Sequence, residues 1–190
     1  MSENLLLEKD GTPVTLLSKQ FEKMCINDGA SSDNYHMSRY GVSGVFIKGK
    51  WQPIQSLPDF EGVIGDRGRQ FIFDCKVCSS ASFSLHDDKF KARQLKHMLA
   101  RSQRGVVCFL LIHFNRRKLK TKEVPSVTYG VPVHPDLDFW EQFDRGEVRS
   151  LTKDDCLEFG HKCLWRLNPK ARTPKPDLHS LLLSLSGIFD

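Results

Sequence analysis

Residues 58–76 read PDFEGVIGDRGRQFIFDCK, and this stretch decides the fold. It contains two strand-like segments, 60–65 and 69–77, joined by the Gly- and Arg-rich sequence DRGR, which is typical of a hairpin turn. Alternate residues of a strand point to opposite faces, so Asp74 and Lys76 share one face of an otherwise apolar strand. Two charges at such positions each need a compensating partner.

Asp59 adds a second carboxylate, fifteen residues before Asp74. If the two segments pair through the turn, the Asp59 end of one lies near the Asp74 end of the other, with Lys76 beside them. Mg²⁺ and Mn²⁺ bind carboxylate oxygens together with backbone carbonyls, and the candidate carbonyl here is that of Cys75. The trio predicts metal-assisted hydrolysis of a phosphodiester, in which Lys76 orients the attacking water or stabilises negative charge. The alternative is an Asp74–Lys76 ion pair at a sheet edge without a catalytic role.

The rest of the chain predicts an α/β fold with a central mixed β-sheet flanked by helices. The elements expected outside the hairpin are helices over 14–27, 87–104 and 136–143, a buried strand within 105–114 and a strand near 126–133. Three prolines predict a linker over 167–176, after a main domain that spans 1–166. Residues 177–190 are expected to form an amphipathic helix, which either docks on the core, as we favour, or binds a partner chain.

The composition is that of a folded protein, because 39% of the 190 residues are hydrophobic and 27% are charged. No apolar stretch is long enough for a membrane span, and the first residues lack the order of a signal peptide, so we expect a cytoplasmic protein. The six cysteines are interpreted as small buried hydrophobes. The CKVC sequence at 75–78 has the spacing of a zinc or redox site, but Cys75 and Cys78 would point to opposite faces of a strand.

The positive charge is concentrated in one part of the chain. The net charge is +5, yet residues 67–122 hold fourteen Lys and Arg against three Asp. Such an asymmetry indicates a polyanionic partner, and the alternative is an ordinary solvated surface.

The motifs resemble those of a known family. Pro58–Asp59 followed by DCK at 74–76 looks like the PD-(D/E)xK nuclease signature. The sequences GRQFIFDCKVCSSASFSL, RQLKHM, GVVCFLLIHF and FW at 139–140 are similar, in this order, to the core of the RecU family of Holliday junction resolvases. The resemblance covers about residues 14–145. It implies a restriction-endonuclease-like core, Mg²⁺ or Mn²⁺ as cofactor, and cleavage of branched DNA by a homodimer.

The resemblance also implies roles for single residues. Asp59 and Asp74 match metal ligands, with the Cys75 carbonyl beside them, and Lys76 matches the catalytic lysine. Glu22 resembles the N-terminal acid of such nucleases. Gln94 and His97, with Arg101 one turn further along, match supporting positions near metal or DNA. The basic residues would then bind the DNA backbone: Arg67 and Arg69 at the turn between the acidic strands, Arg101, and Arg116, Arg117 and Lys118 after the central strand.

Two features depart from the family. RecU proteins carry a long stalk between the first strands, whereas the corresponding stretch GKWQPIQSLP is short, and Asp74 stands where the family usually has Glu. Other hypotheses therefore stay open: a PD-(D/E)xK nuclease that acts on other DNA, a catalytically silent DNA-binding recombination accessory protein, and a protein-interaction domain with a buried ion pair.

Overall fold

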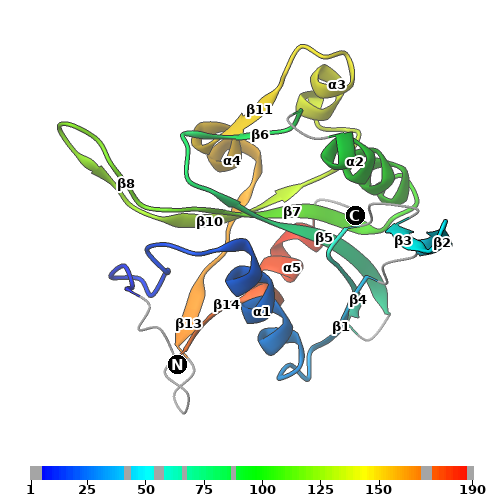
Figure 1. Cartoon of the computed structure of the whole chain (residues 1–190). Coiled ribbons are helices and arrows are strands. Elements are labelled where there is room, and N and C mark those ends of the chain that lie inside the picture. Colours follow the sequence, from blue (N-terminus) through cyan, green and yellow to red (C-terminus); the bar gives the residue numbers. More distant parts are fainter. Residues whose placement is uncertain are drawn as a thin grey trace.

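The computed structural model describes residues 6–40, 44–53, 58–65, 68–86, 89–167 and 173–187 (Figure 1). Its centre is a six-stranded sheet with the order β1-β4-β5-β7-β10-β12. These strands are β1 (Tyr35–Arg39), β4 (Phe60–Ile64), β5 (Arg69–Cys78), β7 (Val107–Phe114), β10 (Val127–Pro132) and β12 (His161–Lys162). Only β5 and β7 pair in parallel, and the other neighbours are antiparallel. The predicted mixed sheet is confirmed.

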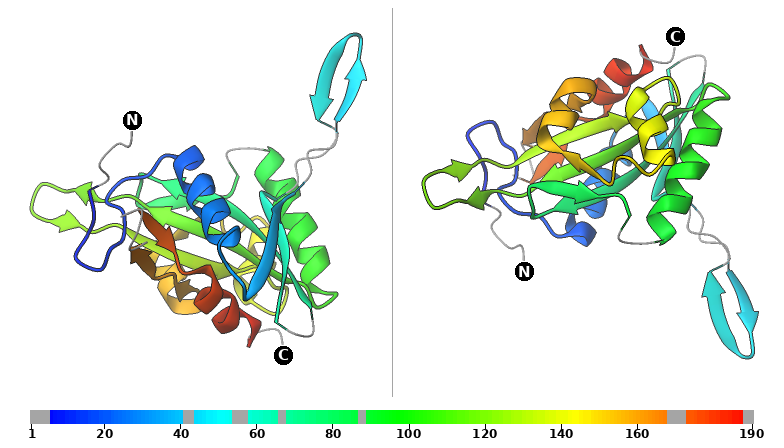
Figure 2. Two further views of the ribbon diagram at one scale, coloured as in Figure 1. Left: turned by 90° about the horizontal axis from the view of Figure 1, so that it is seen from below. Right: turned by 90° about the horizontal axis from the view of Figure 1, so that it is seen from above.

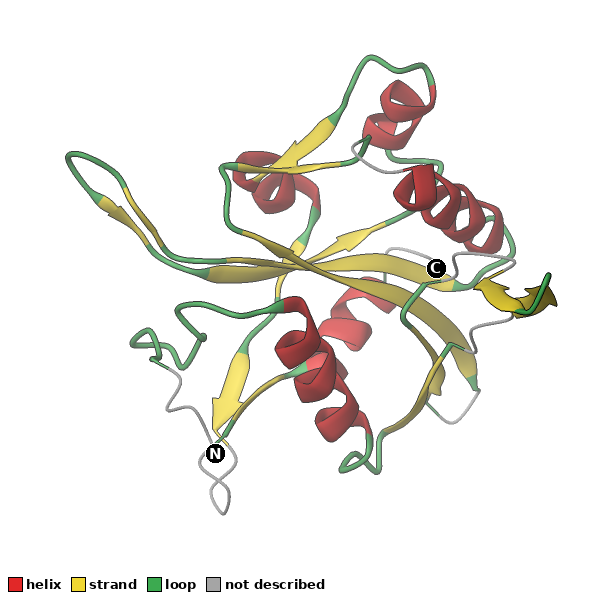
Figure 3. Ribbon diagram, in the orientation of Figure 1, coloured by secondary structure: helices red, strands yellow, loops and turns green. Residues whose placement is uncertain are grey.

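Helices cover both faces of this sheet (Figures 1 and 3). On one face lie α1 (Ser18–Gly29) and α5 (Leu178–Ser186). On the other face lie α2 (Lys89–Ser102), α3 (Asp138–Asp144) and α4 (Lys153–Phe159). In the described part of the chain, no helix is both long enough and apolar enough to cross a bilayer.

Strand β5 sends alternate residues into two separate cores. Phe73 and Cys75 belong to the core that α1 and α5 cover, and Ile72 and Cys78 belong to the core under α2. Asp74 therefore lies on the α2 side, as the alternation predicts. The two cysteines of CKVC are on opposite faces, so this motif does not gather its thiols into a metal site.

Strands β2 (Gly44–Ile47) and β3 (Lys50–Pro53) form a short hairpin between β1 and β4. Its turn has positive φ at Lys48 (51°) and Gly49 (75°), which is the type I′ geometry of a two-residue hairpin. Figure 2 shows this hairpin standing out from the body, and it follows β1 and precedes β4 in the chain. A short projection therefore stands where the sequence led us to expect a stalk much shorter than that of the family.

A second hairpin continues β7 and β10 beyond the sheet. Its strands are β8 (Arg117–Lys118) and β9 (Glu123–Val124), which pair antiparallel. The motifs did not predict this extension, because an apolar run ends at Phe114 and the following residues are polar. Elsewhere, β6 (Ser82–Ser84) pairs with β11 (Ser150–Thr152).

The region expected to be a linker contains a strand. Within it, β14 (Pro174–Pro176) pairs with β13 (Trp165–Leu167), and residues 168–172 lie outside the described ranges. The Asp177 N–H donates to the Leu164 carbonyl, so in this register both prolines of β14 occupy non-hydrogen-bonded positions, where a missing N–H costs nothing.

Helix α5 docks on the core. Its buried residues are Leu178, Leu181, Leu182 and Leu185. Leu181 packs so closely on β10 that a Cβ at Gly130 would come within 2.8 Å of it. The C-terminal segment thus docks as we favoured, and Ile188 at its end lies outside the described residues.

Candidate active site

Asp59 and Asp74 occupy opposite positions on neighbouring strands. The last residues paired between β4 and β5 are Phe60 and Phe73, and one further step of the antiparallel register sets Asp59 opposite Asp74. Such positions share a face of the sheet, with Cβ atoms about 5 Å apart. The Asp59 Oδ2 atom also accepts a hydrogen bond from the Cys75 N–H, at 2.8 Å. The structure thus brings together the two acids that the hairpin hypothesis paired.

Lys76 completes this group. Its Nζ forms an ion pair with Oδ2 of Asp74, whose side chain is only 1% exposed. Burial raises the pKa of Asp74, the Lys76 charge opposes that rise, and the Asp59 charge adds to it. Burial alone would lower the pKa of Lys76, but the charges of Asp74 and Asp59 outweigh it and raise this pKa. Lys76 is therefore a cation at neutral pH.

When both acids are ionised, the group has more negative than positive charge, and it also has a ligand atom without a partner. Two carboxylates face one ammonium, and Oδ1 of Asp74 is buried without a hydrogen-bond partner among the described residues. The Cys75 carbonyl points to the same side of β5 as its N–H, which is the Asp59 side. A hard divalent cation supplies the missing charge, and Mg²⁺ typically takes one or two carboxylates along with waters and substrate phosphates.

The donor set is small. Within the ranges that the structure describes, no group of three or more His, Cys, Asp or Glu side chains could hold a metal ion. The protein ligands on offer are thus two carboxylates and a carbonyl. This set fits Mg²⁺ or Mn²⁺, and it does not fit a structural zinc ion, which needs four Cys or His ligands.

His97 approaches the acidic pair through Tyr40. The two rings meet edge to face, with centroids 6.1 Å apart, and the Tyr40 N–H donates to the Asp59 carbonyl at 3.0 Å. Burial and the nearby charge of Arg101 lower the pKa of His97, so its imidazole is neutral at pH 7. Tyr40 was not singled out from the sequence, because its position depends on the β1–β4 register and on no motif.

Gln94 and Arg101 lie on the same face of α2 as His97, and they approach the same part of the sheet. Gln94 is buried, with 8% of its surface exposed. Arg101 donates from Nη2 to Oε1 of Gln70 on β5, at 3.1 Å. The helix face that carries Gln94, His97 and Arg101 is therefore directed toward the sheet.

Glu22 is not brought to this group. It lies on α1, on the opposite face of the sheet from Asp74, and forms an ion pair with Arg39 of β1. Phe21 and Cys25 fix this orientation because they are the fully buried residues of the helix. A catalytic role for Glu22 stays a prediction that these contacts do not favour.

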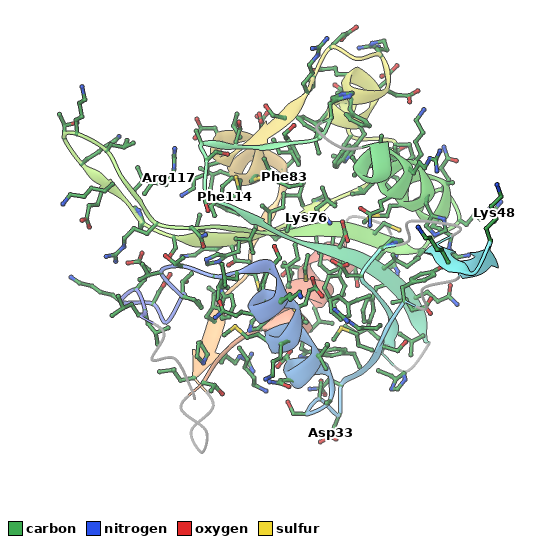
Figure 4. The ribbon with its side chains drawn as sticks, viewed as in Figure 1. Asp33, Lys48, Lys76, Phe83, Phe114 and Arg117 are labelled. Atoms are coloured by element: carbon green, nitrogen blue, oxygen red, sulfur yellow. The ribbon has the colours of Figure 1, made fainter. Side chains whose placement is uncertain are left out.

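The basic residues proposed for DNA differ in their partners. Arg69 donates to the Ser186 carbonyl at the end of α5, at 3.0 Å. Arg116 binds Glu8 through two hydrogen bonds. Arg117 and Lys118 lie on β8, and Figure 4 places Arg117 where that hairpin begins and Lys76 near the middle of the sheet. Arg67 lies outside the described residues.

Comparisons with known proteins point to one family. A model of the family "recombination protein U" (RecU) matches residues 4–169. The "Holliday junction resolvase RecU" of Bacillus pumilus is 30% identical over 129 residues, which cover 67% of this chain and 56% of that protein. The RecU proteins of Ligilactobacillus salivarius and Limosilactobacillus reuteri are 26% and 28% identical over the same length, with 54% and 57% of each covered. The chain spans a little over half the length of the curated relatives it matches.

Proposed function

Since this chain belongs to the recombination protein U family, we propose that it is a metal-dependent endonuclease that cuts phosphodiester bonds in branched DNA. The observation that carries the proposal is the cross-strand pair of Asp59 and Asp74 with the Lys76 ammonium beside it. The relatives that the chain matches are named as Holliday junction resolvases, and this supports a four-way junction as the substrate.

The metal site of the proposal consists of the Asp59 and Asp74 carboxylates and the Cys75 carbonyl. A bound Mg²⁺ or Mn²⁺ polarises the scissile phosphate and lowers the pKa of the attacking water. Lys76 remains protonated, so it acts as a fixed cation rather than as a base. Its ammonium donates hydrogen bonds to the phosphate oxygens as negative charge develops there.

The DNA contacts of the proposal come from the basic residues around this group. Arg101 on α2 is half-buried, and its Nη2 donates to Gln70 of β5, so its guanidinium lies at the surface beside this part of the sheet. Contacts of this kind bind phosphate without reading sequence. Two active sites are needed for paired incisions across a two-fold symmetric junction, so the active form of the proposal is a homodimer.

The test is a cleavage assay on a synthetic four-way junction and on linear duplexes of the same sequence, with and without Mg²⁺ or Mn²⁺. The proposal predicts paired nicks near the branch point only with metal, and loss of cleavage with retained binding in Asp74→Ala and Lys76→Ala. Equal cleavage of the linear duplexes would instead identify a nuclease for other DNA. Binding without cleavage under every metal would identify a catalytically silent accessory protein.

A further inference from the structure

The β8–β9 hairpin, residues 117–124, is a basic arm that extends past the central sheet (Figures 1 and 2). The N–H of Leu119 donates to the Lys122 carbonyl at 2.8 Å and closes the tip into one turn. Residues 118–123 are exposed. The arm is therefore a narrow two-stranded ribbon whose outer part is exposed to solvent.

The arm carries positive charge that the protein does not neutralise. Lys118, Lys120 and Lys122 form no ion pair with any described residue. The one acid of the arm, Glu123, has its carboxylate 3.8 Å from Nη1 of Arg116 at the base. Three exposed ammonium groups on one short ribbon produce a positive potential that attracts a polyanion.

A cluster of contacts holds the base of the arm in place. Glu8 accepts hydrogen bonds from Arg116, just before β8, and from the N–H and Oγ of Ser126, just after β9, both at 3.0 Å. The Arg116 interaction holds the pKa of Glu8 down to about 2, against the effect of burial, so this link stays ionised at neutral pH. Arg116 is thus a positioning residue for the arm and not one of its free cations.

A lysine of α4 supports the same base. Lys153 Nζ donates to the Pro125 carbonyl at 3.0 Å and lies 5.5 Å from the centre of the Phe114 ring. Burial and the charge of Arg117 lower the pKa of Lys153, and the charge of Glu8 opposes this only in part, so Lys153 and Arg117 are two cations close together. An arm fixed at its base loses little conformational freedom on binding, which favours affinity.

We propose that the basic arm lies along one duplex arm of the DNA substrate and contacts its backbone up to about eight base pairs from the scissile phosphate. This rests on the proposed function for the position of that phosphate. Lys76 pairs with Ile112 in the β5–β7 register, and Lys120 follows Ile112 by eight residues, which span at most about 26 Å in a fully extended chain. Duplex DNA rises about 3.4 Å per base pair, so this upper limit equals about eight base pairs.

The direction and shape of the arm agree with a duplex partner. Figure 1 shows the arm bending to the side of the sheet that α2 and α4 cover, which is the side of Asp74 and Lys76. A two-stranded ribbon fits the major groove of B-DNA. The proposal assigns Lys118, Lys120 and Lys122 to phosphates, and contacts to phosphates carry no sequence information.

The test measures binding of junctions with duplex arms of about 5 and about 12 base pairs, on either side of the expected reach. Ca²⁺ replaces Mg²⁺, and Lys120→Ala/Lys122→Ala is compared with the wild type. The matched control is Lys19→Ala/Lys23→Ala, which removes two exposed lysines from α1 on the opposite face. The proposal predicts that the wild type binds the junction with long duplex arms more tightly than the junction with short ones. Only Lys120→Ala/Lys122→Ala should lose this difference in affinity.

Salt dependence gives a second readout on the long-armed junction. Two lost phosphate contacts lower the slope of log affinity against log salt by about 2, so the advantage of the wild type shrinks about tenfold between about 50 and about 200 mM salt. Equal affinities and slopes for wild type and Lys120→Ala/Lys122→Ala would overturn the proposal that the basic arm contacts DNA, while leaving the nuclease proposal intact. Failure of the wild type to bind either junction would overturn both. Thermal unfolding of each variant shows whether the fold is retained.

Discussion

The Asp59 carboxylate accepts the backbone N–H of Cys75 at 2.8 Å, and this bond ties the acid before β4 to the strand that carries Asp74. One carboxylate oxygen of Asp59 is used to hold the two strands in register. The proposed metal site assigns the other oxygen to the cation. The position of the candidate metal site therefore depends on a main-chain contact as well as on the two acids.

Substitutions of Asp59 separate these two tasks. Asp59→Asn keeps an oxygen that accepts the Cys75 N–H, so the free energy of unfolding should change by less than about 0.5 kcal/mol. Asp59→Ala leaves that N–H without its partner and should lose about 1–3 kcal/mol. Both variants should lose cleavage on the order of a hundredfold or more, because the ligand charge is gone. Junction cleavage and urea unfolding measure the two effects, and full activity in Asp59→Asn would contradict the ligand role.

The Asp74–Lys76 pair should serve activity at the expense of stability. Both side chains are largely withdrawn from water, and apolar or neutral replacements of buried ion pairs are often more stable. We expect Asp74→Asn/Lys76→Met to be inactive and as stable as the wild type or up to about 4 kcal/mol more stable. Urea unfolding at pH 7 measures this. A double variant that unfolds several kcal/mol more easily would show that the pair is a structural element.

Glu22 provides a matched comparison with the acids of the site. Its carboxylate binds Arg39 on the face of the sheet away from Asp74. Glu22→Gln should therefore change the cleavage rate less than about threefold, and the loss of an exposed ion pair should cost about 0–1 kcal/mol. Single-turnover cleavage rates of Glu22→Gln and Asp74→Asn, measured side by side, check this. An equal loss in both variants would restore Glu22 to the catalytic group.

His113 should make the fold sensitive to mild acid. It is fully buried between the rings of Phe21 and Trp165, and its Nδ1 is 2.8 Å from Oγ1 of Thr128. Burial and the charge of Lys153 lower its pKa from 6.5 to about 4. The folded state then binds fewer protons than the unfolded state below pH 6.5, so this contribution to stability is complete above pH 6.5 and is lost as the pH falls to 4.

The loss amounts to about 3 kcal/mol over that window, from 1.36 kcal/mol per pH unit. Urea unfolding of the wild type and of His113→Gln at pH 7 and at pH 4.5 measures it. The variant starts from a lower stability but should lose less on acidification. Parallel losses in both proteins would assign the acid sensitivity to other groups.

The β4–β5 hairpin and the central strand β7 could be predicted from the sequence for a simple reason. Alternation in 69–77 placed Phe73 and Cys75 on one face and Asp74 on the other, and both cores follow this division. The apolar run within 105–114 became the fully buried strand β7. Local pattern suffices here because each residue of a central strand contacts a core on one face or the other.

Contacts between distant segments could not be predicted in this way. Arg116 was assigned to DNA because it stands in a basic run, but its partner Glu8 is 108 residues away in the chain. Arg69 was assigned to DNA because it stands at the turn between the two acidic strands, and the structure shows that it donates to the Ser186 carbonyl at the end of α5. Tyr40 lies beside Asp59 only through the β1–β4 register. A charge run shows that cations are present, and only the fold shows which of them already have partners.

The central claim is that Asp59 and Asp74 bind one divalent cation with Lys76 alongside. The most direct measurement is anomalous diffraction at the manganese edge from crystals grown with Mn²⁺. We predict one peak at about 2.1 Å from a carboxylate oxygen of each acid, close to the Cys75 carbonyl. A manganese peak at other residues, or fully ordered Asp59 and Asp74 side chains with no peak between them at saturating Mn²⁺, would contradict the claim.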